Sequence, residues 1–314
     1  MCGIAAISLS PNDRDLNVAK AAASLLRSIE KRGRHATGAA WYRHEDDTVA
    51  VTKVAATATI FLKHREEILP ETTPAMLLHT RYATHGNVEE RANNHPIQHD
   101  MILGVHNGVL QNHEAILKDL KVTPNTPVDS EAIMALLNDP TQHPASVLGS
   151  LRGDAAIGWI DLREPEVLHL ARVSGRPLCI AQTKGGSLLM ASTMEALNQA
   201  AKDAEVEFDF TEEVPEAKYL RVAAGRIDEY VDIQGVVKAE DDWRKQFEWT
   251  SGKGAAKAAP AKGSGTSTAK TPAKPAAATT TPAKPIPGQR ALPGTVTPAQ
   301  YAEKVAQRVT VQTS

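Results

Sequence analysis

The sequence has few of the features that mark secreted or membrane-bound proteins. Only two cysteines occur in 314 residues, Cys2 and Cys179, which argues against a disulfide scaffold and favours a reducing compartment. No uninterrupted apolar run reaches the ~18–20 residues that a membrane span requires. The polar residues 12–15 come too early for the apolar core of a signal peptide. We therefore expect a soluble, cytoplasmic protein without a membrane partner.

Acidic and aromatic residues are missing from a long segment near the carboxyl end. Residues 250–300 contain neither kind and consist mainly of Ala, Pro, Lys, Thr and Gly. Such a composition cannot bury enough apolar surface to offset its chain entropy. We therefore expect one large domain at residues 1–249, a disordered basic linker at 250–297 and a short tail at 298–314.

The tail has two readings. Tyr301, Val305 and Val309 would share one face of a helix over residues 298–311, a spacing found in docking peptides. The alternative is a frayed end without a partner. Both readings remain open from the sequence.

The formal net charge of −2 hides a split between body and tail. From residue 250 onward nine Lys and Arg residues face the single acid Glu303, a net charge of +8, so residues 1–249 carry −10. An acidic body argues against an enzyme core that binds nucleic acid. The basic tail leaves a weak, non-specific contact with a polyanion open.

The first candidate for chemistry is Cys2, which directly follows Met1. Once Met1 is removed, Cys2 carries both a thiol nucleophile and a free α-amine that can take the thiol proton. An α-amine has an ordinary pKa of about 7.7–8.0, so no second side chain is needed as the base. Cys179 lies in an apolar run and is expected to be a buried small residue.

Residue patterns predict a mixture of strands and helices. Buried strands are expected at residues 3–9, 75–79 and 101–106, and apolar residues at helical spacing predict a helix from Val18 to Ile29. Further strands are expected at residues 39–43, 49–54, 155–162, 167–171, 178–182, 187–191, 219–222 and 226–231. Further helices are expected at residues 60–68, 113–120 and 193–201, and after Asp129. Runs of strands bracketed by helices predict an α+β fold of two packed sheets with helices outside.

Polar residues gather where several of these elements begin or end. Residues 80–86 follow the strand at 75–79, and Asn107-Gly108 would end the next buried strand in a tight turn. Asp129 would head a helix as its N-cap. Strand ends that carry polar residues are common places for a site. Taken singly, these residues also fit a plain hairpin turn, a surface ion pair for Arg81 and a simple cap.

Together with Cys2, these stretches resemble the class II glutamine amidotransferase domain, an N-terminal-nucleophile (Ntn) hydrolase. The matching stretches, in order, are Cys2-Gly3-Ile4, residues 32–38, His79-Thr80-Arg81-Tyr82-Ala83-Thr84-His85-Gly86, His95-Pro96, His106-Asn107-Gly108, Asp129-Ser130-Glu131 and Leu151-Arg152-Gly153. The resemblance covers the body and stops at the tail. It implies an Ntn-hydrolase-like αββα four-layer sandwich and hydrolysis of the glutamine side-chain amide through a glutamyl thioester.

The resemblance also implies a role for each candidate residue. Cys2 would attack the amide, and Asn107 and Gly108 would donate N–H groups to the oxyanion that forms. Arg81 would hold the α-carboxylate of glutamine with its planar fork of donors, and Asp129 would accept from the α-ammonium. The remaining expected substrate contacts are Tyr82, Thr84 and His85.

One matching stretch departs from the family pattern. Residues 34–37 read Arg-His-Ala-Thr where Tyr-Asp/Glu-Ser/Thr-Ser/Ala is commoner, so contacts that this loop makes in relatives are not carried over. Five histidines occur in the matching stretches, but none pairs at helical i, i+4 spacing and no carboxylate accompanies them. We therefore expect no metal and no other cofactor.

No synthase half is visible in the sequence, which shows no glycine-rich phosphate loop and no second folded domain. One reading is a glutaminase that releases ammonia to a separate acceptor enzyme. A second is a free-standing amidohydrolase on a γ-glutamyl or similar amide. A third is an inactive Ntn-fold interaction protein, against which the joint presence of Cys2, Arg81, Asn107, Gly108 and Asp129 argues.

Overall fold

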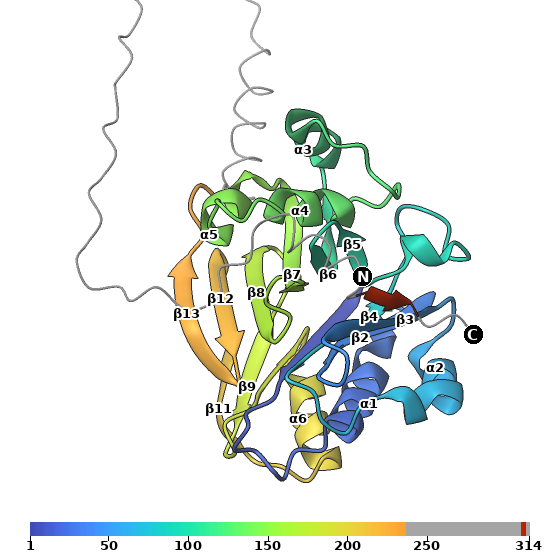
Figure 1. The fold of residues 1–314 in the computed structure, drawn as a ribbon, viewed down its shortest axis with the longest axis vertical. Coiled ribbons are helices and arrows are strands. Elements are labelled where there is room, and N and C mark those ends of the chain that lie inside the picture. Colours follow the sequence, from blue (N-terminus) through green and yellow to red (C-terminus); the bar gives the residue numbers. More distant parts are fainter. Residues whose placement is uncertain (237–308, 312–314) are drawn as a thin grey trace, which may run out of the picture.

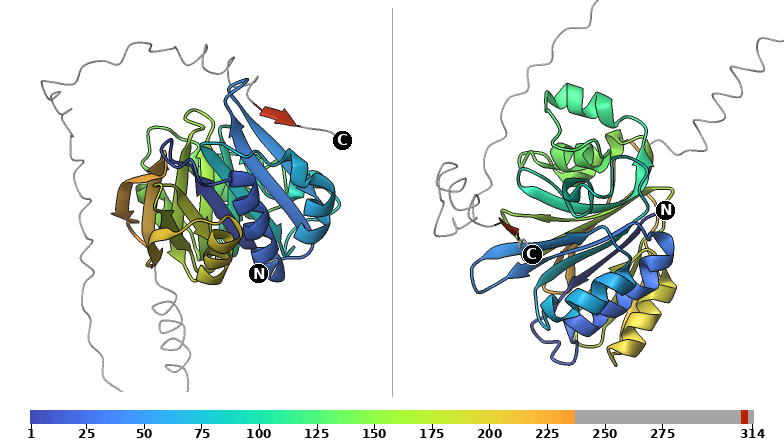
Figure 2. Two further views of the ribbon diagram at one scale, coloured as in Figure 1. Left: turned by 90° about the horizontal axis from the view of Figure 1, so that it is seen from below. Right: turned by 90° about the vertical axis from the view of Figure 1, so that its right-hand side faces the viewer.

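The structure, a computed structural model, describes residues 1–236 and 309–311, and it stacks two β-sheets between two layers of helices (Figure 1). The right-hand view of Figure 2 shows the four layers edge-on, with α1, α2 and α6 below the sheets and α3, α4 and α5 above them. This is the αββα sandwich that the sequence predicts.

The first sheet has eight strands in the order β11-β9-β10-β1-β4-β2-β3-β14. Its central strand β1 (Gly3–Ser8) pairs antiparallel with β4 (Ala75–Arg81) on one side and with β10 (Leu188–Ala191) on the other. All six residues of β1 are buried, which explains why its sequence shows no polar alternation. The other strands are β2 (Ala36–Arg43), β3 (Thr48–Val54), β9 (Cys179–Thr183), β11 (Phe208–Glu213) and β14 (Val309–Val311).

The second sheet has six strands in the order β13-β12-β8-β7-β6-β5. Antiparallel pairing joins all neighbours in this sheet. The strands are β5 (Ile97–His99), β6 (Ile102–Leu110), β7 (Gly153–Asp161), β8 (Val167–Ser174), β12 (Lys218–Ala223) and β13 (Arg226–Asp232).

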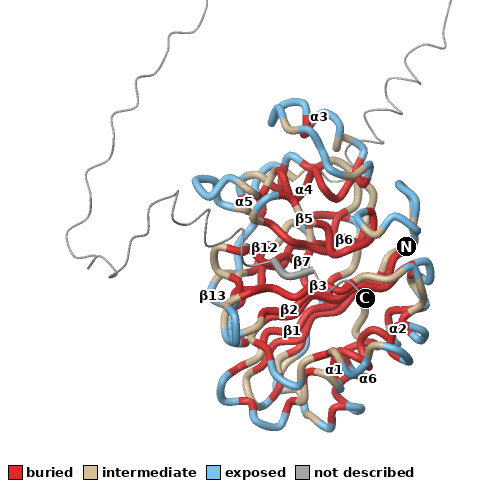
Figure 3. The backbone as a smooth tube through the Cα atoms, turned by 45° about the vertical axis from the view of Figure 1, so that its right-hand side comes forward, coloured by how far each residue is buried: buried red, intermediate tan, exposed pale blue. Residues whose placement is uncertain are grey.

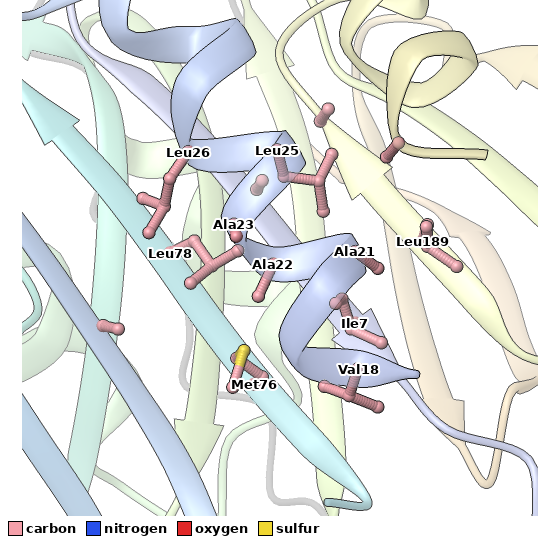
Figure 4. Close-up of a cluster of buried hydrophobic side chains, with 14 of the residues drawn as sticks. Ile7, Val18, Ala21, Ala22, Ala23, Leu25, Leu26, Met76, Leu78 and Leu189 are labelled. Carbon is pink, nitrogen blue, oxygen red and sulfur yellow. The ribbon is translucent and has the colours of Figure 1, made fainter. Parts of the chain in front are cut away.

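Helices cover the outer face of each sheet. Apolar residues of α1 face the first sheet, and Figure 4 shows Leu26 beside Leu78 of β4 and Leu25 on the side nearer β10. The side chain of Asn17 accepts a hydrogen bond from Lys20 N (3.0 Å) and so caps the start of α1. The helices are α1 (Val18–Ile29), α2 (Ala58–Arg65), α3 (His113–Leu120), α4 (Ser130–Leu137), α5 (Pro144–Val147) and α6 (Met194–Asp203).

Three apolar layers result from this stacking, and the buried stretches in Figure 3 follow the strands through the middle of the molecule. Neighbouring residues of β1 serve different layers because side chains alternate across a strand. Ala5 and Ile7 pack in the layer shared with α1, whereas Ile4 and Ala6 pack in the layer between the sheets. A third layer lies between the second sheet and α4.

Several expectations differ from the structure. Strand β6 does not stop before Asn107 but continues to Leu110, with Asn107 paired to Ala156 and Gly108 to Ala155. The predicted turn is therefore wrong, since the pairing with β7 extends through both residues. Strands β5 and β11 and helix α5 were not expected. The acidic residues of β11 are uncommon in strands, and its alternating burial fits an edge strand.

Most of the expected linker and tail lies outside the described residues. This holds for residues 250–297 and for most of the segment 298–314. The exception is β14, which pairs parallel with β3, so the helix expected over residues 298–311 does not extend to Val309–Val311. Three consecutive β-branched residues favour a strand there. None of the described helices is long and apolar enough to cross a membrane.

Candidate active site

The ends of three strands bring the predicted site together. In the first sheet Gly3 lies opposite Thr80, and Ala36 lies opposite Arg81. The start of β1, the end of β4 and the start of β2 therefore lie at the same end of the first sheet. The amino terminus lies at this end, between the two helical layers (Figure 2). Cys2 is thus held beside the polar residues that follow β4.

Close packing at this end of the sheet explains why residue 3 is glycine. A Cβ atom there would lie 2.6 Å from Thr80 Oγ1 and 2.7 Å from Ile29 Cβ, distances that no side chain tolerates. Thr80 Oγ1 itself donates to Ile29 O (2.9 Å), at the end of α1. Strand β1 can therefore enter between β4 and α1 only with glycine directly after Cys2.

The thiol of Cys2 is bracketed by the backbone of Tyr82. Tyr82 N donates to Cys2 Sγ (3.4 Å), and Sγ in turn donates to Tyr82 O (3.6 Å). Burial raises the pKa of the Cys2 thiol, although the Tyr82 backbone, the positive amino terminus and Arg81 act in the opposite direction. A thiol with a raised pKa needs a base before it can attack.

Asn107 reaches the nucleophile from the second sheet. In the orientation that satisfies both ends of its amide, Nδ2 donates to Cys2 O (3.0 Å) and Oδ1 accepts from Arg32 Nη2 (3.3 Å). The side chain is almost fully buried. An amide nitrogen has two N–H donors, so the bond to Cys2 O leaves a second one.

Arg32 also belongs to the site, although its role was not predicted from the sequence. Its Nε donates to Cys2 O (3.1 Å), and its Nη2 donates to the amide of Asn107. One guanidinium therefore holds both the backbone of the nucleophile and the amide beside it. The available signal was the position of Arg32 at the start of a matching stretch.

Arg81 is buried and not part of a surface ion pair. Nη1 donates to Asn94 Oδ1 (2.7 Å), and Nη2 donates to the backbone carbonyls of His85 and Gly86. Burial lowers the pKa of Arg81, whereas Cys2 and Asp129 act to raise it. The residues after β4 thus fold back around the guanidinium.

Asp129 stands at the N-cap position of α4, but its side chain makes no capping bond there. Oδ2 instead accepts from Leu110 N (2.8 Å), at the end of β6. The expectation of a plain N-cap is therefore corrected, because the unpaired N–H at the end of β6 takes one carboxylate oxygen. The other oxygen, Oδ1, lies 3.5 Å from Ser130 Oγ.

The three remaining predicted residues lie on the segment that follows β4. The Tyr82 side chain is half exposed, and its ring stacks on His35. The hydroxyl of Thr84 lies 3.2 Å from Nδ1 of His85. For His85, the contact with the other predicted residues is made by its backbone carbonyl, which accepts from Arg81. The structure therefore brings the backbone of this segment to the site, while the side chains of Tyr82 and Thr84 are exposed and the His85 ring packs edge-on against His113.

Behind the site, three histidines of the matching stretches are buried together. His95 Nε2 and His106 Nδ1 lie 3.0 and 2.9 Å from Ser130 Oγ, and His79 stacks on His95 at 4.1 Å. Burial lowers the pKa of His79 to about 3, and it also lowers those of His95 and His106. These rings are therefore neutral near pH 7 and tie β4, β6 and α4 together.

The described residues form no cluster of metal ligands at this constellation. Within residues 1–236 and 309–311, no three His, Cys, Asp or Glu side chains gather as metal ligands. A cavity of about 570 Å³ lies elsewhere, and its lining includes Trp159, His169 and Tyr219 but none of the predicted site residues.

Comparison with known sequences agrees with this geometry. Residues 79–199 match a family model described as a glutamine amidotransferase domain. Over 207 residues the chain is 30% identical to the glutamine–fructose-6-phosphate aminotransferases (isomerizing) of Shigella flexneri and Escherichia coli K12. Each alignment covers 63% of this chain but 32% of the relative. The chain thus spans only part of the length of these curated relatives.

Solved structures share the fold at low sequence identity. The glutamine phosphoribosylpyrophosphate amidotransferase of B. subtilis matches with a TM-score of 0.59 and 18% identity, over 74% of this chain and 49% of that chain. A structure described as the allosteric regulatory enzyme of purine biosynthesis matches with a TM-score of 0.60 and 17% identity, with the same coverage.

The four-layer sandwich, with a cysteine at the mouth of its central strand, defines an Ntn-hydrolase fold. Within this class, residues 79–199 match the glutamine amidotransferase family model, and the chain is similar to class II glutamine amidotransferase domains. The resemblance that the sequence motifs indicate is thereby confirmed.

Proposed function

We propose that Cys2, once Met1 is removed, hydrolyses the side-chain amide of glutamine and releases ammonia. The observation that carries this proposal is the convergence on Cys2 of two sheets, through the Tyr82 backbone on one side and Asn107 on the other. Arg81 and Asp129 lie close enough to the thiol for their charges to affect its pKa. A nucleophile, an amide donor and two oppositely charged groups are what glutamine requires.

The proposed reaction begins with transfer of the thiol proton to the α-amine of Cys2. The sulfur then bonds to the amide carbon of glutamine, and the carbonyl electrons move to oxygen. Asn107, through its second N–H, and the N–H of Gly108 stabilise this oxyanion. Collapse of the intermediate expels the nitrogen, which takes the proton back from the amine and leaves as ammonia. Water then hydrolyses the glutamyl thioester, which yields glutamate and restores the thiol.

The two charged groups are proposed to hold the amino-acid end of glutamine. The planar guanidinium of Arg81 suits a carboxylate in bidentate geometry, and binding would exchange its present contacts with the carbonyls of His85 and Gly86. Oδ1 of Asp129 would accept from the α-ammonium, since Oδ2 is held by Leu110 N. Thr84 and Tyr82 would close over the substrate from the same segment.

Conservative changes at these two residues test the binding roles. We expect Arg81→Lys and Asp129→Asn each to raise KM for glutamine and also to lower kcat, because a substrate held in the wrong place reacts poorly. Steady-state kinetics on glutamine would measure both constants. The exposed ion-paired residue Arg27 offers a control, since Arg27→Lys should change neither. Unchanged KM in both site variants would contradict the roles proposed here.

We propose that the ammonia is used by a separate acceptor enzyme in the cytoplasm, where a free thiol stays reduced. The named relatives carry an aminotransferase activity on fructose 6-phosphate, and this chain aligns with 32% of their length. The second candidate is a free-standing amidohydrolase on a γ-glutamyl amide, which the same site chemistry would serve.

An assay of glutamate release by the purified protein, with Met1 removed as verified by mass, separates these candidates. Activity on glutamine that rises when an acceptor enzyme is added supports the first. Faster turnover of γ-glutamyl amides than of glutamine, without any partner, supports the second. Absence of hydrolysis of either substrate would leave only an inactive Ntn-fold protein.

We further propose that residues 1–249 are the glutaminase domain and that residues 250–314 recruit its partner through a linker and a terminal peptide. Removing residues 250–314 takes away the edge strand β14 but none of the strands that carry the site, so glutamine hydrolysis should be unchanged. Partner recovery should fall, because a tethered peptide raises the local concentration of the domain. Pull-downs from native extract with both versions, at low and high salt, measure this.

Salt distinguishes two modes of recruitment. A contact of the lysines with a polyanion should weaken steeply as salt rises, whereas apolar docking of the terminal peptide should change little. Equal partner recovery by full-length and shortened protein would show that the tail does not recruit.

A further inference from the structure

The loop that departs from the family pattern lies directly against the segment that follows β4. His35 N donates to Arg81 O (2.9 Å), which fixes the backbone of this histidine at the end of the strand. Its ring Nδ1 accepts from Ala83 N (3.0 Å), and its ring stacks on Tyr82 with centroids 4.9 Å apart and planes at 28°. One side chain thus makes contact with two consecutive residues beside the nucleophile.

The contact with Ala83 bears on Cys2 through a single peptide unit. The N–H of Ala83 and the C=O of Tyr82 belong to the same planar group. Its N–H donates to His35 Nδ1, and its C=O accepts from Cys2 Sγ (3.6 Å). A rotation of this unit away from the thiol would break the bond to His35. The orientation of the Tyr82 carbonyl is therefore tied to the imidazole.

The same segment also reaches the other proposed binding group. Two and three residues after Ala83, the backbone carbonyls of His85 and Gly86 accept from Arg81. Residues 82–86 therefore touch both the thiol and the guanidinium that we propose for the α-carboxylate. A fixed point at Ala83 limits the freedom of the whole segment.

We propose that His35 is a positioning residue: by accepting from Ala83 N–H it holds the Tyr82–Ala83 peptide beside the thiol for the reaction with glutamine, and it anchors the segment 82–86 when the carbonyls of His85 and Gly86 leave Arg81. This inference rests on the glutaminase function proposed above. It also assigns the tautomer, since Nδ1 must be unprotonated to accept and the ring proton is then on Nε2.

Two shape-matched variants test the acceptor. Asn places an amide oxygen where Nδ1 stands, whereas Leu has a similar outline without an acceptor, and both remove the ring that stacks on Tyr82. We expect His35→Leu to raise KM for glutamine about two- to tenfold over His35→Asn, the effect of one hydrogen bond. Because His35 is exposed, both variants should fold.

Amide hydrogen exchange tests the contact without reference to activity. A peptide covering residues 82–86 should exchange faster in His35→Leu than in His35→Asn, while a peptide from β6 should be unchanged in both. Equal exchange and equal KM in the two variants would overturn the inference. If wild-type protein with Met1 removed hydrolyses no glutamine, the proposed function fails, and the exchange comparison still decides whether His35 holds this segment.

Discussion

A protein that retains Met1 is expected to lose glutamine hydrolysis completely, although its thiol is intact. The thiol of Cys2 has a pKa raised by burial, and the proposed base is the α-amine of the same residue. A peptide bond to Met1 converts this amine into an amide nitrogen, which cannot take a proton near neutral pH. Met1 is 59% exposed, with its sulfur 2.8 Å from Arg176 Nη1, so it lies within reach of a processing enzyme.

The measurement compares two forms of one protein. In one, an uncleaved tag precedes Met1; in the other, a protease has exposed Cys2 as the first residue, and intact mass verifies both. We expect glutamate release only from the second. Cys2→Ser in the processed form should also fail, because an alkoxide is far harder to form than a thiolate near neutral pH. Full activity of the tagged protein would rule out the N-terminal-nucleophile mechanism.

The buried strands and the main helices could be predicted because their residue patterns are local. Strand β1 is a continuous apolar run with Cys2 at its start, and α1 shows apolar residues at helical spacing between a polar cap and Gly33. Alternation and periodicity depend only on neighbours in the chain. The layering follows, since such elements must bury their apolar faces against one another.

Features that depend on contacts between distant residues could not be predicted in this way. Asn107-Gly108 resembles a turn locally, but pairing with Ala156 and Ala155 of β7 keeps it in a strand. A Cβ at Gly108 would lie 1.8 Å from Asp154 O, so this glycine serves the approach of β7 and not a turn. Tertiary pairing overrides the local signal.

The site shows the same division between residue identity and arrangement. The candidates Cys2, Arg81 and Asp129 follow from the family resemblance of the stretches that contain them, and the structure gathers them at one end of the strands. The part played by Arg32 depends on a contact with Cys2 O across thirty residues, which no spacing rule indicates. The contact of His35 with Ala83 spans forty-eight residues and was equally hidden.

Replacing Asn107 is the second change from which we expect a large effect. The oxyanion forms only when sulfur attacks, so a donor aimed at it stabilises the transition state more than bound glutamine. Asn107→Ala should therefore lower kcat by about 10²–10³ with little change in KM. Asn138→Ala is a suitable control, because Asn138 bonds Asp100 and Met101 at the other end of β6 and should leave both constants unchanged.

Asn107 also supports the backbone of the nucleophile. Its amide also holds Cys2 O and accepts from Arg32, so alanine removes both an oxyanion donor and a support of the nucleophile. Labelling of Cys2 by iodoacetamide separates these effects, because alkylation forms no oxyanion. If the oxyanion role dominates, the labelling rate of Asn107→Ala stays near that of the wild-type protein while kcat falls. A change confined to KM, or a fall in labelling as large as the fall in kcat, would assign Asn107 to holding Cys2 in place instead.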